Sequence, residues 1–408
     1  MSTFIYSCIT IKFTGMKKFH SAITVLFFLI ILSFTAKSQY SHEYELNIYT
    51  ENNDGPYLIY KGNKVEIITV KFINDKPRLK IDSCTIKELA GKKIKVKPNI
   101  KMPSFSVKVF DYQPELSFYK APEKLLVISD IEGNFEDFTK ILRVAGVINK
   151  KYEWVYGKNH LLINGDLFDR GDDVTALLWL CYKLDNESQL LGGKVHIKLG
   201  NHDQMNMEGD IRYIDSKYLK LDSLLGIEHK NLYNENTEIG RWLRTKNAIT
   251  IIDSTLFVHG GISPDLINLN LNPQQINQII RENLGKDDSQ MDKITKFLFG
   301  HVGPFWYRGL IMNFEKYKPV TPENLNYILL YFGVKNLVVG HCIVPEIIGL
   351  HEGKVIAVDV NHPLNRKEKK SRALLITNKK FYAVYDNGKI KDLPIKKGFV
   401  SDIEDKKY

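Results

Sequence analysis

The pattern of apolar and polar positions divides the chain into two parts. Residues 40–120 carry short runs of alternating or β-branched residues, separated by turn sequences such as Asn-Asp-Gly at 53–55. Such runs predict β-strands, at Tyr44–Tyr49, Tyr57–Tyr60, Lys64–Phe72, Arg78–Ile81, Lys93–Val96 and Phe105–Val109. We therefore expect a small β-rich accessory module over residues 39–120, in which the sequence indicates no catalytic chemistry.

From Lys124 onward, apolar strands alternate with helices. The first five elements that the spacing of apolar residues predicts are Leu125–Ser129, Asn134–Val147, Leu161–Asn164, Asp173–Leu184 and Val195–Leu199. This alternation favours an α/β layer architecture. The later part is richer in predicted strands, at Ile249–Ile252, Thr255–His259, Leu337–Gly340, Val355–Val360, Arg372–Thr377 and Phe381–Tyr385. We assign residues 121–395 to this second domain and residues 396–408 to a basic tail.

The first residues have the layout of a secretory signal peptide. Lys17 and Lys18 precede an apolar run that ends at Ala36, and Ala36-Lys37-Ser38 offers a small-residue cleavage site. The run is about 15 residues, shorter than the roughly 20 that span a bilayer, although an uncleaved anchor is an alternative. We predict a signal peptide over residues 1–38 (with Met16 as an alternative start), export to the periplasm or the medium, and no membrane span in the mature chain.

Composition and charge exclude few classes of protein and few kinds of partner. With 44% hydrophobic and 25% charged residues, the chain is typical of globular proteins. Its formal charge is +10, and residues 1–38 hold four lysines and no acid, so the rest carries +6. This mild excess gives no argument for a nucleic-acid partner. Four widely spaced cysteines do not make a disulfide framework, and we expect buried free thiols.

Polar side chains of metal-binding types follow five of the predicted strands. Because sites in open α/β sheets form at the carboxyl ends of strands, we expect these side chains to converge. They are Asp130, Asp166, Asn201, His259 and His341. Carboxylate, amide and imidazole ligands suit Mn, Fe, Zn or Co. The set is large enough for two divalent ions that share Asp166 as a bridging ligand.

The order of these motifs resembles that of the calcineurin-like metallophosphoesterase superfamily. The motifs Asp-x-x-Gly, Gly-Asp-x-x-Asp-Arg-Gly, Gly-Asn-His, His-Gly-Gly and Gly-His begin at residues 130, 165, 200, 259 and 340. Segments 240–244 and 255–264 resemble the phosphoprotein phosphatase branch, and segment 303–309 resembles its bacterial Shewanella-like phosphatases. The likeness covers roughly residues 123–362 and none of the N-terminal module. It implies an α/β (α+β) fold, a two-sheet β-sandwich flanked by helices.

The resemblance also implies a role for each matching residue. One metal ion would be held by Asp130, Glu132 and Asp166, and a second by Asp166, Asn201, His259 and His341, with Mn, Fe or Zn as the two divalent ions. A hydroxide bridging the ions would attack phosphorus. His202, paired with Asp169, would protonate the leaving oxygen. Arg170 and Arg308 would bind the phosphate oxygens.

Two positions depart from the family pattern. The family has histidine where this chain has Glu132. A carboxylate can ligate the same ions, so we expect the metal site to be retained; the alternative is that Glu132 points away and the first ion binds weakly. Asp203 stands where phosphoprotein phosphatases usually have glutamate. Among the aromatic residues, we expect Tyr307 to line the substrate cleft and Trp242 to pack in the core.

The expected activity is hydrolysis of phosphate monoesters. The substrate is a phosphorylated protein, with phosphotyrosine or phosphoserine and phosphothreonine, or a small phosphate ester. One alternative is symmetrical dinucleoside tetraphosphate hydrolysis, against which export argues. Another is a non-catalytic phosphate- or protein-binding protein with a metal site damaged at Glu132, although a binder has no need of His202 as a general acid.

Overall fold

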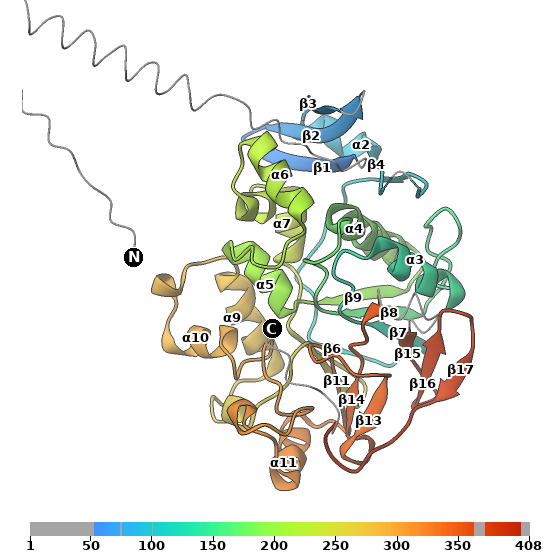
Figure 1. The fold of residues 1–408 in the computed structure, drawn as a ribbon, viewed down its shortest axis with the longest axis vertical. Helices are drawn as coiled ribbons and strands as arrows, with labels where there is room; N and C mark the ends of the chain where they lie inside the picture. Colours follow the sequence, from blue (N-terminus) through green and yellow to red (C-terminus); the bar gives the residue numbers. More distant parts are fainter. Residues whose placement is uncertain (1–52, 74–75, 100, 363–371, 401–408) are drawn as a thin grey trace, which may run out of the picture. The chain divides into compact units, whose positions relative to one another are not determined.

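The computed structural model describes residues 53–73, 76–99, 101–362 and 372–400 (Figure 1). The predicted signal peptide, the predicted strand Tyr44–Tyr49 and residues 401–408 of the predicted tail lie outside these residues. In the described part of the chain, no helix combines the length and the apolar character needed to cross a membrane.

Two six-stranded sheets form the centre of the fold, with strand orders β17-β16-β15-β7-β8-β9 and β13-β14-β12-β11-β10-β6. In the first sheet, β7 (Lys124–Ile128), β8 (His160–Asn164) and β9 (Lys194–Lys198) run parallel. In the second, β11 (Thr255–Val258) lies parallel to β12 (Asn336–Val339). Nearly all residues of β7, β8 and β11 are buried, as expected for strands covered on both faces. The predicted two-sheet architecture is confirmed.

The remaining strands complete the two sheets, with β6, β13 and β17 at their edges. They are β6 (Phe118–Tyr119), β10 (Ile249–Ile252), β13 (Ile348–Leu350), β14 (Val355–Ala357), β15 (Arg372–Thr377), β16 (Lys380–Tyr385) and β17 (Ile390–Asp392). The strand predicted over Val355–Val360 ends at Ala357. Its last predicted residues instead belong to a loop that carries the buried Asp359.

Helices flank both sheets. α3 (Phe135–Val144) and α4 (Val174–Leu190) follow β7 and β8, and α4 packs against β9. α9 (Pro273–Asn283) packs against β10, and Figure 1 shows α9 to α11 on the other side of the sheets from α3 and α4. The other helical segments are α5 (Asn201–Glu208), α6 (Ser216–Leu225), η1 (His229–Tyr233), α7 (Glu238–Leu243), α8 (Pro264–Ile267), η2 (Asp288–Gln290), α10 (Lys293–Phe299), η3 (Glu315–Tyr317), α11 (Pro322–Phe332) and η4 (His351–Gly353).

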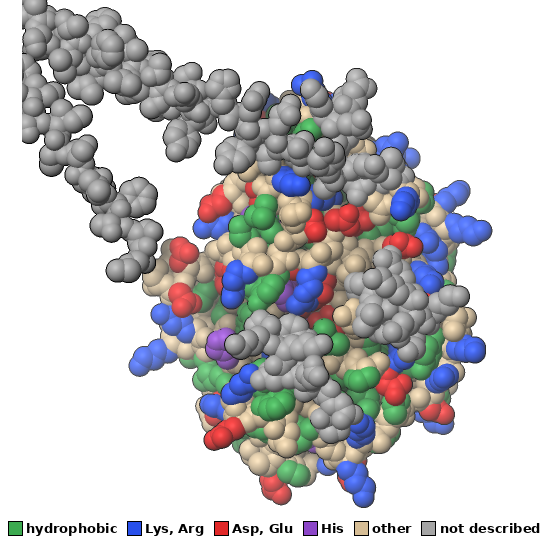
Figure 2. Space-filling view, viewed as in Figure 1, with side chains coloured by type: hydrophobic (Ala, Val, Ile, Leu, Met, Phe, Trp, Pro, Cys, Tyr) green, Lys and Arg blue, Asp and Glu red, His purple; other side chains and the backbone are tan. Residues whose placement is uncertain are grey.

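The N-terminal part is β-rich. An antiparallel sheet of β1 (Asp54–Lys61), β2 (Lys64–Ile73) and β3 (Lys76–Thr85) is followed by α2 (Ile86–Gly91). A short pair comes next, β4 (Ile94–Val96) and β5 (Phe105–Val107). β3 extends well beyond the predicted Arg78–Ile81 because it pairs with β2 along its whole length. Figure 2 shows basic and acidic side chains interspersed over the visible face of the molecule.

Buried polar contacts join this N-terminal sheet to the loop after β8. The Lys217 ammonium lies 2.5 Å from the Asp54 carboxylate and donates to the Asp172 carbonyl oxygen, also at 2.5 Å. The side chains of Lys217 and Asp54 are only 1% and 3% exposed. Trp179 of α4 donates to the Pro56 carbonyl oxygen at 2.8 Å. The N-terminal sheet therefore supports the loop in which Asp166, Asp169 and Arg170 lie.

Replacing Lys217 with methionine is expected to lower the free energy of unfolding by about 3–5 kcal/mol, because the Asp54 carboxylate is left buried without its counter-ion. Chemical denaturation measures this loss, with Lys286→Met at an exposed lysine as the control. The double variant Asp54→Asn/Lys217→Met should recover part of the loss. A Lys217→Met protein as stable as the control would contradict the role of this ion pair.

Candidate active site

The predicted site residues meet around a cavity of about 370 Å³. Eight of them line it: Asp130, Glu132, Asp166, Arg170, Asn201, His202, Arg308 and His341. The other two, Asp169 and His259, are buried and contact lining residues directly: Asp169 contacts His202, and His259 contacts Asn201. Residues from five separate strand ends are therefore brought to one place, as the sequence pattern predicts.

The backbone is strained where these side chains enter the cavity. The φ angles of Asp130, Glu132, Asp166, Asp169, Arg170 and His341 lie between 48° and 74°, a region that costs a non-glycine residue about 1–3 kcal/mol. Neighbouring glycines make room for the side chains. A Cβ atom at Gly165 (φ 92°) would lie 2.4 Å from His259 Nδ1, and one at Gly200 would lie 2.1 Å from Asp166 Oδ1.

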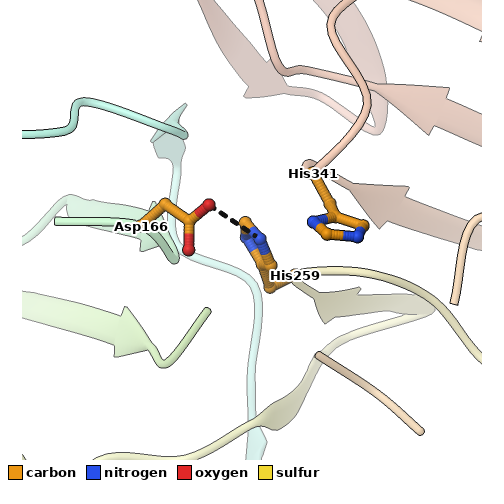
Figure 3. Close-up of side chains that lie close together, drawn as sticks. All are labelled: Asp166, His259 and His341. Carbon is orange, nitrogen blue, oxygen red and sulfur yellow. Dashed lines mark ion pairs between the residues drawn. The ribbon is translucent and has the colours of Figure 1, made fainter. Parts of the chain in front are cut away.

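Asp166, His259 and His341 form one candidate metal-binding group (Figure 3), with one ligand atom from each inside 4.8 Å of the others. His259 Nε2 lies 3.1 Å from Asp166 Oδ2 and 2.9 Å from Asn201 Oδ1. His341 Nε2 is buried, with no hydrogen-bond partner among the described residues. A buried nitrogen left unpaired on a residue grouped with a carboxylate and a second imidazole fits a metal ligand.

Charges in this group are strongly coupled. Burial disfavours the charged form of His259, but Asp166 and Asp130 outweigh it and raise the pKa of His259 to about 10. Burial also opposes ionisation of Asp166, but His259 and His202 lower its pKa to about 2. Burial, together with the nearby Arg308, holds the pKa of His341 well below its usual range. The group therefore offers an ionised carboxylate and one neutral imidazole as ligands for a divalent cation, and His259 would act as a third ligand only in its neutral form.

Glu132, Asp166 and His202 form a second candidate metal-binding group. Glu132 Oε1 pairs with the Arg170 guanidinium. Glu132 lines the cavity rather than pointing away from it. The Asp130 carboxylate, at the same edge, accepts from the His341 backbone N–H at 3.2 Å.

His202 is fixed in position by its neighbours. Its Nδ1 contacts Asp169 Oδ2, and its backbone N–H donates to Asp166 Oδ1 at 2.9 Å. Asn206 donates to the other oxygen of Asp169 at 2.7 Å and itself contacts His229 Nε2 at 2.9 Å. With Nδ1 held in this way, His202 presents Nε2, which lies 3.3 Å from Arg170 Nη2.

Several lining residues were not identified from the sequence. They add positive charge and aromatic rings: Arg212, Tyr213, His301, Lys316 and Tyr317. The prediction that Tyr307 lines the cleft is wrong. Its ring is buried, and its hydroxyl donates to the Lys318 carbonyl oxygen at 2.7 Å, while Trp306 lines the cavity instead. Trp242 is buried, as predicted.

Two further carboxylates support the site. Asp359 lines the cavity, and burial together with the charge of Asp130 raises its pKa well above the usual range. Asp203 accepts backbone N–H groups of Gly200, Asp166 and Leu167 at 2.7–3.0 Å, so it fixes the turn that carries Asp166. Asp359 follows an apolar strand like the other site residues, and that pattern could have identified it.

Comparisons with known proteins agree with this geometry. The family model for calcineurin-like phosphoesterases matches residues 123–345. One similar solved structure is the crystal structure of the cold-active protein-tyrosine phosphatase of a psychrophilic Shewanella species, which is 31% identical in sequence. The match covers 84% of this chain and 99% of the Shewanella chain, with a TM-score of 0.73. Shewanella-like protein phosphatase 2 of Arabidopsis thaliana is 25% identical over 293 residues, 59% of this chain and 72% of the relative. Shewanella-like protein phosphatase 1 of Plasmodium berghei is 26% identical over 221 residues, 53% and 60% of the two chains.

The structural likeness includes part of the N-terminal β-rich region. A match over 84% of 408 residues is about 343 residues, more than the 288 from residue 121 to the end. The structural match is therefore longer than the motif resemblance predicted over roughly residues 123–362, and the family model, which matches residues 123–345, agrees with the predicted extent of that resemblance. Metallophosphoesterases bind divalent metal ions, and the two ligand groups described above fit this property. The chain belongs to the calcineurin-like phosphoesterase family.

Proposed function

We propose that this protein is an exported, two-metal phosphomonoesterase that acts on phosphotyrosine in proteins. The observation that carries the proposal is the placement of His202, held through Asp169 and lining the same cavity as two candidate metal-binding groups and two arginines. A proton donor, fixed positive charge and metal ligands around one cavity are what phosphate ester hydrolysis requires.

The ligand groups fit two divalent ions of the Mn, Fe or Zn type. One would be held by Asp166, Asn201, His259 and His341, and the other by Asp130, Glu132 and Asp166. His202 also lies near Glu132 and Asp166, but because Asp169 holds its Nδ1 we assign it to proton transfer and not to metal binding. When bound, such ions polarise the phosphate ester and activate water. The protein side chains bind and orient the ester: Arg170 and Arg308 place positive charge at the cavity wall for its oxygens. His202, held at Nδ1 by Asp169, presents Nε2 as the atom that would give a proton to the leaving oxygen.

The aromatic lining favours an aryl phosphate. Tyr213, Trp306 and Tyr317 surround the same cavity as the arginines, and their rings can pack against a phenyl group. The likeness to a protein-tyrosine phosphatase supports the same choice. Paired peptides that differ only in phosphotyrosine or phosphoserine test it. We expect kcat/KM to favour phosphotyrosine by about 10–200-fold, and an equal or reversed preference would contradict the assignment.

Replacing Glu132 with alanine is expected to raise the metal concentration needed for half-maximal activity by more than about tenfold. Loss of a residue that only orients a metal ligand typically weakens metal binding by about 10–100-fold, and loss of a ligand should weaken it at least as much. Metal titration of chelator-treated protein measures it. Glu132→His, which restores the family residue, is the matched variant and should keep tight metal binding. If alanine and histidine leave the titration unchanged, Glu132 serves only to pair with Arg170.

The proposal that the protein is exported rests on the basic, apolar and small residues that follow one another over residues 17–38. Expression of the full chain followed by cell fractionation tests it. A mature protein beginning near Gln39 outside the cytoplasm is the expected result, and an intact chain in the cytoplasm would contradict it.

A further inference from the structure

A second cavity, of about 460 Å³, lies in the N-terminal β-rich region. One side of it is formed by Ile67, Thr69 and Lys71 of β2 with Lys80 and Asp82 of β3, and another by the segment 92–97. We call this cavity the basic groove. Its lysines are Lys71, Lys80, Lys92, Lys93, Lys95 and Lys97.

Part of the positive charge of the basic groove has no acidic partner among the described residues. Both acids among the described residues that line it already have partners, since Asp82 pairs with Lys80 at 2.5 Å and Asp54 with Lys217. The other exposed lysines form no ion pair in the described part of the chain: Lys71, Lys92, Lys93 and Lys95. Lys71 also lies directly opposite Arg78 on β3, a like-charge pair that costs stability. The charges of Lys71, Lys92, Lys93 and Lys95 are therefore exposed and open to an acidic partner.

The spacing of the lysines matches an extended polypeptide. Around β4, Lys93, Lys95 and Lys97 alternate with the buried Ile94 and Val96. Alternate residues on a strand are about 6.6–6.8 Å apart, which is also the spacing of side chains on one side of an extended peptide. None of the described residues that line the groove is aromatic, so this lining offers no stacking surface of the kind used to bind single-stranded nucleic acid.

We propose that the basic groove binds an extended acidic segment of polypeptide, and that this segment belongs to the phosphoprotein substrate, outside its phosphorylated residue. The claim that the segment belongs to a phosphoprotein substrate rests on the proposed function, whereas the claim that the groove binds an acidic segment does not. The groove is connected to the active-site loop, because Asp54 lines the groove and holds Lys217, which in turn donates to the Asp172 carbonyl oxygen.

A labelled, unphosphorylated peptide of alternating glutamate and glycine tests binding directly by fluorescence anisotropy. We expect saturable binding that weakens as salt is raised, and about tenfold or greater loss of affinity in the triple variant Lys71→Glu/Lys93→Glu/Lys95→Glu. The matched control reverses three exposed lysines outside both cavities, Lys150, Lys151 and Lys158, and should bind like the wild type. Denaturation curves of both triple variants check that each is folded.

Catalysis gives a second, separate readout. For a tyrosine-phosphorylated peptide with an acidic extension, the groove variant should lose about tenfold in kcat/KM relative to the control variant, while hydrolysis of a small aryl phosphate stays unchanged. Peptide binding without turnover of any phosphate would overturn the proposed function and leave the groove assignment standing. Turnover of phosphotyrosine with no binding of the acidic peptide, or equal loss in both triple variants, would overturn the groove assignment. Binding of a sulfated oligosaccharide or anionic vesicles that the peptide cannot displace would also overturn it.

Discussion

Replacing His202 with alanine is expected to lower kcat for phosphotyrosine hydrolysis by about 10²–10⁴-fold. The imidazole is held at Nδ1 by Asp169, so its Nε2 is the group able to protonate the departing tyrosine oxygen. The loss should be much smaller for p-nitrophenyl phosphate, because p-nitrophenolate is a weaker base and leaves with less need of a proton. Steady-state kinetics with both esters on the same protein preparations measure the two losses.

The matched control for this experiment is His301→Ala. His301 also lines the cavity, but its neighbours differ from those of His202. Its ring contacts the ring of Trp306, and among the described residues it has no carboxylate contact like the one between His202 and Asp169. We expect it to change KM more than kcat. If His202→Ala slowed both esters equally, His202 would act by binding phosphate and not by transferring a proton.

Replacing Asp166 with asparagine is expected to have the largest effect of any single change at the site. Asp166 belongs to both candidate metal-binding groups and forms an ion pair with His259. Loss of the charge weakens a ligand common to both ions. The fall in kcat/KM should therefore be well over the roughly 10–100-fold that follows when a residue that only orients a metal ligand is replaced. Metal content measured by mass spectrometry after dialysis should fall as well.

Asp265→Asn serves as the control for this variant. Asp265 is an exposed carboxylate paired with Lys318 at 2.8 Å, and removing its charge should change neither metal content nor rate. An Asp166→Asn protein that keeps both its metal and its activity would contradict the bridging role. Loss of folding, checked by chemical denaturation, is not expected, because asparagine can still accept the His202 backbone N–H.

The sequence predicts the sheets and the site well for a simple physical reason. Strands buried on both faces require continuous apolar runs, and the polar residues that end such runs must lie at one edge of a sheet. This is why Asp130, Asp166 and Asn201 could be placed together without coordinates. The same reasoning, applied to the apolar run before Asp359, would have included that residue.

Other features depend on tertiary contacts that no local pattern encodes. The ion pair between Lys217 and Asp54 joins residues far apart in the chain, and it makes the N-terminal sheet a support for the active-site loop. Trp306 and Tyr307 are adjacent and both aromatic, so their sequence context could not show which one faces the cavity. Glu132 and Arg170 lie in turns that follow two different strands, so their contact could not be predicted from the sequence around either residue.

The most direct test is p-nitrophenyl phosphate hydrolysis by chelator-treated protein beginning at Gln39, with Mn, Fe, Zn, Co or Mg added back one at a time. We expect turnover only with added divalent metal, and none above background in Asp166→Asn. Turnover without metal, or a folded protein that binds both metal and phosphate but hydrolyses no ester with any ion, would contradict a metal-dependent phosphoesterase.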